Sequence, residues 1–84
     1  MLDTTQVVRH YKYNKDTQNH AWDCDILFIN EEPISMGFYI WNLGDSDKWE
    51  EVMAADISED LGYKVEISGI NSGNGHGGAK IRKL

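Results

Sequence analysis

Apolar and polar residues alternate in several short stretches of the chain, and this pattern predicts most of the fold. Residues 5–13 (TQVVRHYKY) are rich in β-branched and aromatic side chains and place Val7, Tyr11 and Tyr13 on one face. The next ten residues are rich in turn formers, and the short apolar run 24–30 (CDILFIN) follows them. We therefore expect a first strand, a loop and a second strand.

The third expected strand follows the only proline of the chain. Pro33 has no amide hydrogen to donate to a strand ladder, so residues 31–33 should form a turn or the start of an edge strand. Residues 34–41 (ISMGFYIW) predict the strand itself, and the first three strands should form a meander. Apolar side chains at 38–41 fall on both faces, so we expect part of this aromatic area to be exposed.

The apolar period changes to four residues after the third strand, which predicts a helix over residues 46–61. Asp45 or Ser46 can cap the first amides of this helix, and Gly62 supplies a stop signal. The apolar residues that recur along one ridge are Trp49, Met53, Ile57 and Leu61.

Two further strands are expected after the helix. Residues 63–68 alternate between apolar and polar side chains, and residues 79–84 (AKIRKL) form a short apolar and basic tail. The glycine-rich segment 72–78 between them predicts a flexible hairpin loop, in which glycines serve positive φ angles. The expected fold class is α+β: a single small domain over residues 1–84, with an antiparallel sheet of about five strands and one main helix in the order β-β-β-α-β-β.

Acidic residues are concentrated in the middle of the chain. Its formal net charge is −6, and residues 23–66 hold twelve of the 14 acidic residues but only two lysines. Such a surface repels nucleic-acid phosphates and attracts a basic protein groove, although acidity alone can also serve solubility. A chain of 84 residues is too short for a bilobed enzyme with a deep cleft, and it carries no catalytic signature. We therefore expect a binding protein and assign no catalytic residue.

Candidate cofactor and metal sites are weak. His20, Asp23, Cys24 and Asp25 lie close in sequence but match no zinc spacing, and a single cysteine excludes both an intramolecular disulfide and a four-cysteine site. No metal or cofactor is therefore expected. The sequence has no apolar run long enough for a membrane span and no signal-peptide pattern at its start, which favours a cytoplasmic protein.

The glycine-rich residues 71–78, with His76, support a rival reading as a small nucleotide- or metal-binding module. Glycine-rich backbone can present several amides to an anion, but phosphate loops open a helix, whereas a strand-like tail follows here. The hairpin interpretation is therefore favoured.

Three short segments resemble the phage uracil-DNA glycosylase inhibitor family: 32–36 (EPISM), 49–53 (WEEVM) and 80–84 (KIRKL). They are similar to the edge-strand motif, the acidic helix and the C-terminal strand of that family. Pro33 stands where the family has serine, and the two expected strands before the motif have no counterpart. The resemblance implies a small acidic DNA mimic that occludes the DNA-binding groove of the enzyme.

This resemblance and the acidic pattern together predict a partner-binding surface. The residues assigned to it are Glu31, Glu32, Ile34, Met36, Glu50, Glu51 and Met53. The expected partner is a basic DNA-handling protein, with uracil-DNA glycosylase as the first candidate, and direct contact with nucleic acid or a membrane is not expected. Another phage anti-defence inhibitor (anti-CRISPR or anti-restriction) and a subunit of a phage or bacterial assembly remain alternatives. Residues 31–33 could also form an ordinary charged turn that protects a sheet edge.

Overall fold

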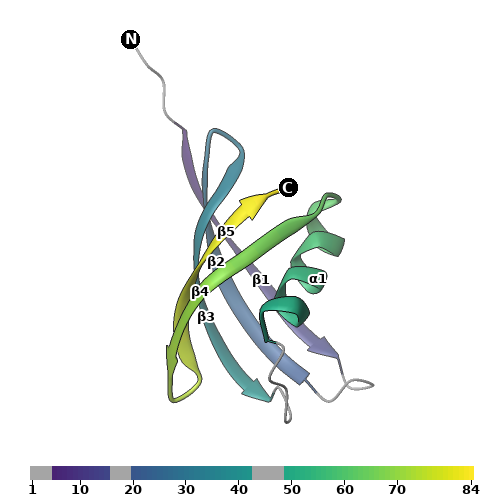
Figure 1. Cartoon of the computed structure of the whole chain (residues 1–84), viewed down its shortest axis with the longest axis vertical. Coiled ribbons are helices and arrows are strands. Elements are labelled where there is room, and N and C mark those ends of the chain that lie inside the picture. The colour runs from purple at the N-terminus through teal and green to yellow at the C-terminus, as the bar shows by residue number, and fades with distance from the viewer. Residues whose placement is uncertain (1–4, 16–19, 43–48) are drawn as a thin grey trace.

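The structure, a computed structural model, describes residues 5–15, 20–42 and 49–84. It consists of one antiparallel sheet and one helix that packs against it (Figure 1). The elements in chain order are β1 (Gln6–Lys15), β2 (His20–Ile29), β3 (Glu32–Asn42), α1 (Trp49–Leu61), β4 (Val65–Gly73) and β5 (His76–Lys83). The predicted α+β class and the predicted order of strands and helix are confirmed.

The strands lie in the order β1-β2-β3-β5-β4, and all neighbours are antiparallel. The first three strands therefore form the expected meander, but β3 is the middle strand of the sheet. Of the two alternatives for residues 31–33, the turn is found at Glu31, whereas β3 as a whole is not an edge strand. Pro33 fits inside β3 because the pairing with β5 covers only Ser35 to Tyr39, so its missing amide hydrogen leaves no gap in that ladder.

The first hairpin extends further than its turn-rich sequence suggests. Residues 14–23 were expected to form a loop, but β1 runs to Lys15 and β2 begins at His20. The reason is a pair of buried rings, because Tyr13 faces Trp22 across the ladder and stacks on it at a centroid distance of 4.8 Å. Burial of two large aromatic side chains outweighs the local turn preference.

The sheet curves around α1, so that one face is concave and covered by the helix (Figure 1). Buried side chains from every strand meet the helix there, and no described element covers the other face. The core comprises Tyr13, Trp22, Cys24, Ile26, Phe28, Met36, Phe38, Ile40, Met53, Ile57, Val65, Ile67 and Ile81. No helix within the described residues is long and apolar enough to cross a membrane.

The helix ends as its sequence predicts. Gly62 has φ of 82°, and its amide donates a hydrogen bond of 2.9 Å to the carbonyl of Ser58. This is a left-handed C-terminal cap, which glycine adopts without steric cost. The predicted caps Asp45 and Ser46 lie outside the described residues.

The glycine-rich segment forms a tight hairpin. Only Asn74 and Gly75 make the turn, with φ of 55° and 82°, and both flanking strands continue up to it. These angles are those of the two-residue turn for which Asn-Gly is preferred. The predicted hairpin is confirmed, but the predicted loop over 72–78 is wrong. Gly77 lies within β5, where an added Cβ would come within 2.7 Å of the Phe38 ring.

Candidate functional site

The seven residues predicted to bind a partner do not form one surface. Glu31, Glu32 and Ile34 are exposed around the β2–β3 turn, and Glu50 and Glu51 are exposed in the first turn of α1. The other two belong to the core: Met36 is 5% exposed and Met53 is fully buried. The assignment of these two methionines to a binding surface is therefore corrected.

The two acidic groups lie near opposite ends of the helix. Glu31 lines a pocket together with Leu61, the last residue of α1, whereas Glu50 lies in its first turn. Eleven residues separate Glu50 from Leu61, which corresponds to about 16 Å along a helix axis. Figure 1 shows the β2–β3 turn near the end of the molecule where the helix finishes. A contact that includes both groups would therefore have to extend along the length of the helix.

Four of the five exposed residues of α1 are acidic, and the fifth is Ala55. Its 13 residues include five aspartates and glutamates and no lysine or arginine, and all of these acids except Asp56 are exposed. We define the acidic helix face as Glu50, Glu51 and Glu59. Asp60 is also exposed, but it follows the buried Asp56 by four residues and lies on the side of the helix toward Tyr13. Acidic residues in the first turn favour a helix, but Glu59 and Asp60 in the last turn oppose the helix dipole. Helix stability therefore does not account for this pattern.

A shallow groove of about 430 Å³ separates the start of α1 from β4. Its rim includes Glu50, Glu51 and Glu66, and its lining also includes the apolar side chains of Ala54 and Leu84. Carboxylates here lie directly beside apolar area. The groove can therefore offer both charge and desolvated contact to a partner.

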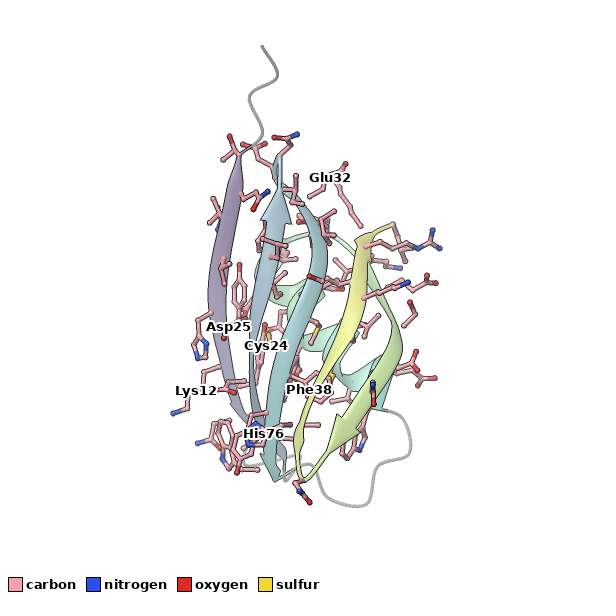
Figure 2. The ribbon with its side chains drawn as sticks, turned by 90° about the vertical axis from the view of Figure 1, so that its left-hand side faces the viewer. Lys12, Cys24, Asp25, Glu32, Phe38 and His76 are labelled. Carbon is pink, nitrogen blue, oxygen red and sulfur yellow. The ribbon has the colours of Figure 1, made fainter. Side chains whose placement is uncertain are left out.

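The uncovered face of the sheet carries a row of stacked rings. Tyr39 stacks on His76 at a centroid distance of 4.3 Å and on Trp41 at 5.9 Å, and Nζ of Lys12 lies 5.6 Å from the Trp41 ring centroid. Tyr39 and Trp41 are 38% and 42% exposed, which confirms the expectation of exposed aromatic area on this strand. Figure 2 shows Lys12 and His76 on this face, with the helix behind the sheet.

The suggested metal ligands point to different sides of β2. His10 bridges Asp25, with Nδ1 and Oδ1 2.7 Å apart, and Asp23, with Nε2 and Oδ2 3.5 Å apart, on the uncovered face. Cys24 lies between the two aspartates in sequence but is buried on the helix side. No group of three or more metal-ligating side chains comes together among the residues that the structure describes. The side chain of His20 is outside that set.

The environment of Cys24 makes it a poor nucleophile. Burial first, and then the charges of Asp23 and Asp25, raise the pKa of its thiol to about 12. The reactive form of cysteine is the thiolate, which is scarce at neutral pH under these conditions. The residue acts as a small apolar core side chain.

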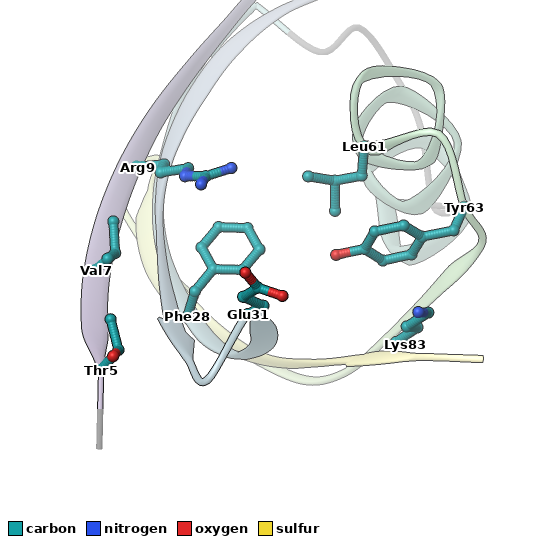
Figure 3. A pocket seen from close by; sticks show the side chains of 8 residues that line it. All are labelled: Thr5, Val7, Arg9, Phe28, Glu31, Leu61, Tyr63 and Lys83. Carbon is teal, nitrogen blue, oxygen red and sulfur yellow. The ribbon is translucent and has the colours of Figure 1, made fainter. Parts of the chain in front are cut away.

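A second pocket was not foreseen from the sequence. This inner pocket, of about 430 Å³, opens between the concave face of the sheet and the end of α1 (Figure 3). Its lining residues come from distant segments: Thr5, Val7, Arg9, Phe28, Glu31, Leu61, Tyr63 and Lys83. One sequence signal was present, because Arg9 occupies an inward position between Val7 and Tyr11 and so interrupts the apolar face of the first strand.

Comparisons of the chain with protein-family models, with curated proteins and with solved structures find no match. The similarity to uracil-DNA glycosylase inhibitors therefore rests on the three short segments in the sequence. The function has to be argued from the residues and their geometry.

Proposed function

We propose that the protein is a small, non-enzymatic binding protein that attaches stoichiometrically to a basic DNA-handling protein through the acidic helix face. Uracil-DNA glycosylase is the first candidate for this partner. The observation that carries the proposal is a helix of 13 residues with five acids, no basic residue and four exposed carboxylates.

Two of these carboxylates can face the same positive groove of a partner. Glu51, Ala55 and Glu59 follow one another at intervals of four residues, so they lie on one side of the helix. The two glutamates are then separated by about 12 Å along the axis. A row of negative charge of this length would steer the helix toward a positive cleft and speed association.

Apolar contact would slow the release of the partner. In the groove beside the helix, Ala54 and Leu84 are next to Glu50 and Glu51, and Leu84 is largely exposed. DNA has no equivalent apolar side chains at its phosphates. Burial of this area in the complex would lower the dissociation rate, which governs most differences in affinity.

The proposal includes a second, weaker contact at the β2–β3 turn, formed by Glu31, Glu32 and Ile34. They are exposed near the other end of α1, so a partner groove that runs along the helix could reach them as a second contact. Their removal should weaken the complex less than charge reversal on the helix itself.

The rival classes differ in what they bind. Another anti-defence inhibitor would use the same acidic helix face on a different DNA-handling protein. A nucleotide-binding role for residues 71–78 has little support. The segment consists of two strand ends joined by the turn at Asn74 and Gly75, and it opens no helix whose amides could hold a phosphate.

A uracil-excision assay with excess protein tests the first candidate, and a pull-down from bacterial lysate with mass spectrometry tests the class. Glu51→Lys should reduce association about tenfold at low salt. The matched control is the double change Gln6→Lys and Asn14→Lys, which alters the net charge equally on exposed positions of β1, away from the groove beside the helix, and should have little effect. Unhindered uracil excision would exclude the glycosylase. Recovery of no DNA-handling protein would argue against the whole class.

A further inference from the structure

The inner pocket has the dimensions of a small-molecule site. Its volume of about 430 Å³ lies in the range of ligand pockets, which is roughly 300–1,000 Å³. It is formed where the curved sheet leaves the end of α1, so one wall is strand and the other is the helix terminus and the residues after it (Figure 3).

Two aromatic side chains stand on opposite walls of the inner pocket. Phe28 projects from β2, Leu61 from the end of the helix and Tyr63 from the segment after it. The Tyr63 hydroxyl points toward the space in front of Phe28 (Figure 3). This arrangement leaves room for a planar apolar group between the two walls. Offset stacking and edge contacts with such rings stabilise an aromatic ligand.

Three charged side chains surround the same space without neutralising one another. Within the described part of the chain, Arg9, Lys83 and Glu31 form no ion pair or hydrogen bond. Each cation lies instead over a ring: the Arg9 guanidinium carbon is 5.1 Å from the Phe28 centroid, and Lys83 Nζ is 4.8 Å from the Tyr63 centroid. Both signs of charge are therefore available to a ligand.

We propose that the inner pocket binds a small aromatic zwitterion of the chemical class of the free aromatic amino acids. The aromatic group lies between Phe28 and Tyr63, and the carboxylate of the ligand meets Arg9, with Lys83 beside it. The ammonium group meets Glu31. This binding site is separate from the acidic helix face. The protein would therefore bind a small molecule in addition to the partner protein proposed above.

The chemistry of Tyr63 agrees with this arrangement. Burial first, and then the neighbouring Tyr11, raise the pKa of its phenol, and the positive charge of Arg9 partly opposes this effect. The hydroxyl therefore stays protonated at neutral pH and can donate a hydrogen bond into the pocket.

Titrations followed by changes in the amide NMR shifts test the proposal with three probes that share an indole ring and differ in their charged groups. L-tryptophan carries both charges, indole-3-propionate only the carboxylate and tryptamine only the ammonium group. We expect L-tryptophan to bind with a Kd on the order of 1 mM or lower and to shift the amides around Arg9, Phe28 and Tyr63. Each single-charge probe should bind about tenfold more weakly.

Charge-neutral variants assign each contact. Arg9→Gln should reduce L-tryptophan binding to about the level of tryptamine, and Glu31→Gln to about the level of indole-3-propionate. Both side chains are exposed, so the fold should persist. Lys80→Gln removes one exposed positive charge on the other face of the sheet and should leave binding unchanged. Equal binding of all three probes, unchanged binding to Arg9→Gln, or no shifts at about 10 mM L-tryptophan would each overturn the proposal.

Discussion

The indole nitrogen of Trp22 donates a hydrogen bond of 2.8 Å to Oδ2 of Asp56, and this bond joins β2 to α1 inside the core. Trp22 is fully buried and Asp56 is 4% exposed. Asp56 is the only charged side chain in the described part of the structure that is buried to this degree. Because a buried carboxylate needs such donors, the bond fixes the rotation of the helix against the sheet.

Removal of the indole donor should therefore destabilise the fold. We expect Trp22→Phe to lower the free energy of unfolding by about 1–3 kcal/mol through the loss of this buried hydrogen bond to a charged group, with a further loss from packing. A double-mutant cycle with Asp56→Ala, measured by urea denaturation, separates the two effects. The coupling energy should be about 1–2 kcal/mol. Additive effects would show that the bond contributes nothing.

Two glycines of the sheet should respond in opposite ways to alanine. At Gly77 an added Cβ would come within 2.5 Å of the Asn71 carbonyl oxygen and 2.7 Å of the Phe38 ring. At Gly37 its nearest contact would be ordinary, at 3.8 Å from the Gly77 carbonyl oxygen. We expect Gly77→Ala to cost about 2 kcal/mol and Gly37→Ala to be neutral or to stabilise by about 0.5 kcal/mol. Thermal unfolding of both variants checks this, and equal losses would contradict it.

Alkaline pH should destabilise the protein through Cys24. Its pKa rises from an ordinary 9.0 to about 12 on folding, so the folded state holds the thiol proton more tightly. The stabilisation is complete below pH 9 and is lost between pH 9 and 12, by about 1.4 kcal/mol per pH unit. Cys24→Ala should flatten the stability profile between pH 9 and 10, whereas a slope should remain above pH 10 because burial also raises the pKa of the Tyr13 phenol from its ordinary 10.0.

The same burial predicts slow chemical modification of Cys24. A thiol-disulfide reagent at pH 8 should label the folded protein at least a hundredfold more slowly than the protein in denaturant, because the buried thiol is protonated and inaccessible. Rapid labelling of the folded protein would show that the strand opens easily.

A single change on the helix should separate stability from partner binding. Ala55 is exposed between Glu51 and Glu59, four residues from each. Ala55→Lys adds favourable charge pairs and should stabilise the helix by about 0.3–0.5 kcal/mol, yet it places a positive charge in the acidic row and should weaken the proposed complex. Ala55→Glu is the control with opposite charge, and it should bind at least as well but fold less stably. Weaker binding by both variants would point to shape as the cause.

Local signals in the sequence were sufficient for the elements of the fold. Gly62 marked the end of the helix and Asn74-Gly75 marked the last turn, because each needs a positive φ that few residues adopt. Alternation also identified Tyr13 as inward-facing. These features depend on neighbours in sequence.

Features that depend on distant neighbours were not predictable in the same way. The middle position of β3 follows from its pairing with β5, and alternation says which residues share a face but not which strand lies beside them. Met36 and Met53 were assigned to a surface because they lie in segments that resemble the inhibitor family, whereas their inward positions decide their burial. Likewise the inner pocket unites Arg9, Glu31 and Lys83, which no local pattern connects.

The sheet also consists of two parts, each built from strands that follow one another in the chain. The β1–β2–β3 meander and the β4–β5 hairpin are joined in the sheet along the pairs from Ser35–Lys80 to Tyr39–His76 and by the hydrogen bond from the Ile40 amide to the Gly75 carbonyl. Closing this seam requires contacts between residues far apart in the chain, and such closure has a large entropic barrier. The rate of folding should therefore be set by the docking of a preformed hairpin onto β3, and the same seam is where two copies of the chain could exchange hairpins.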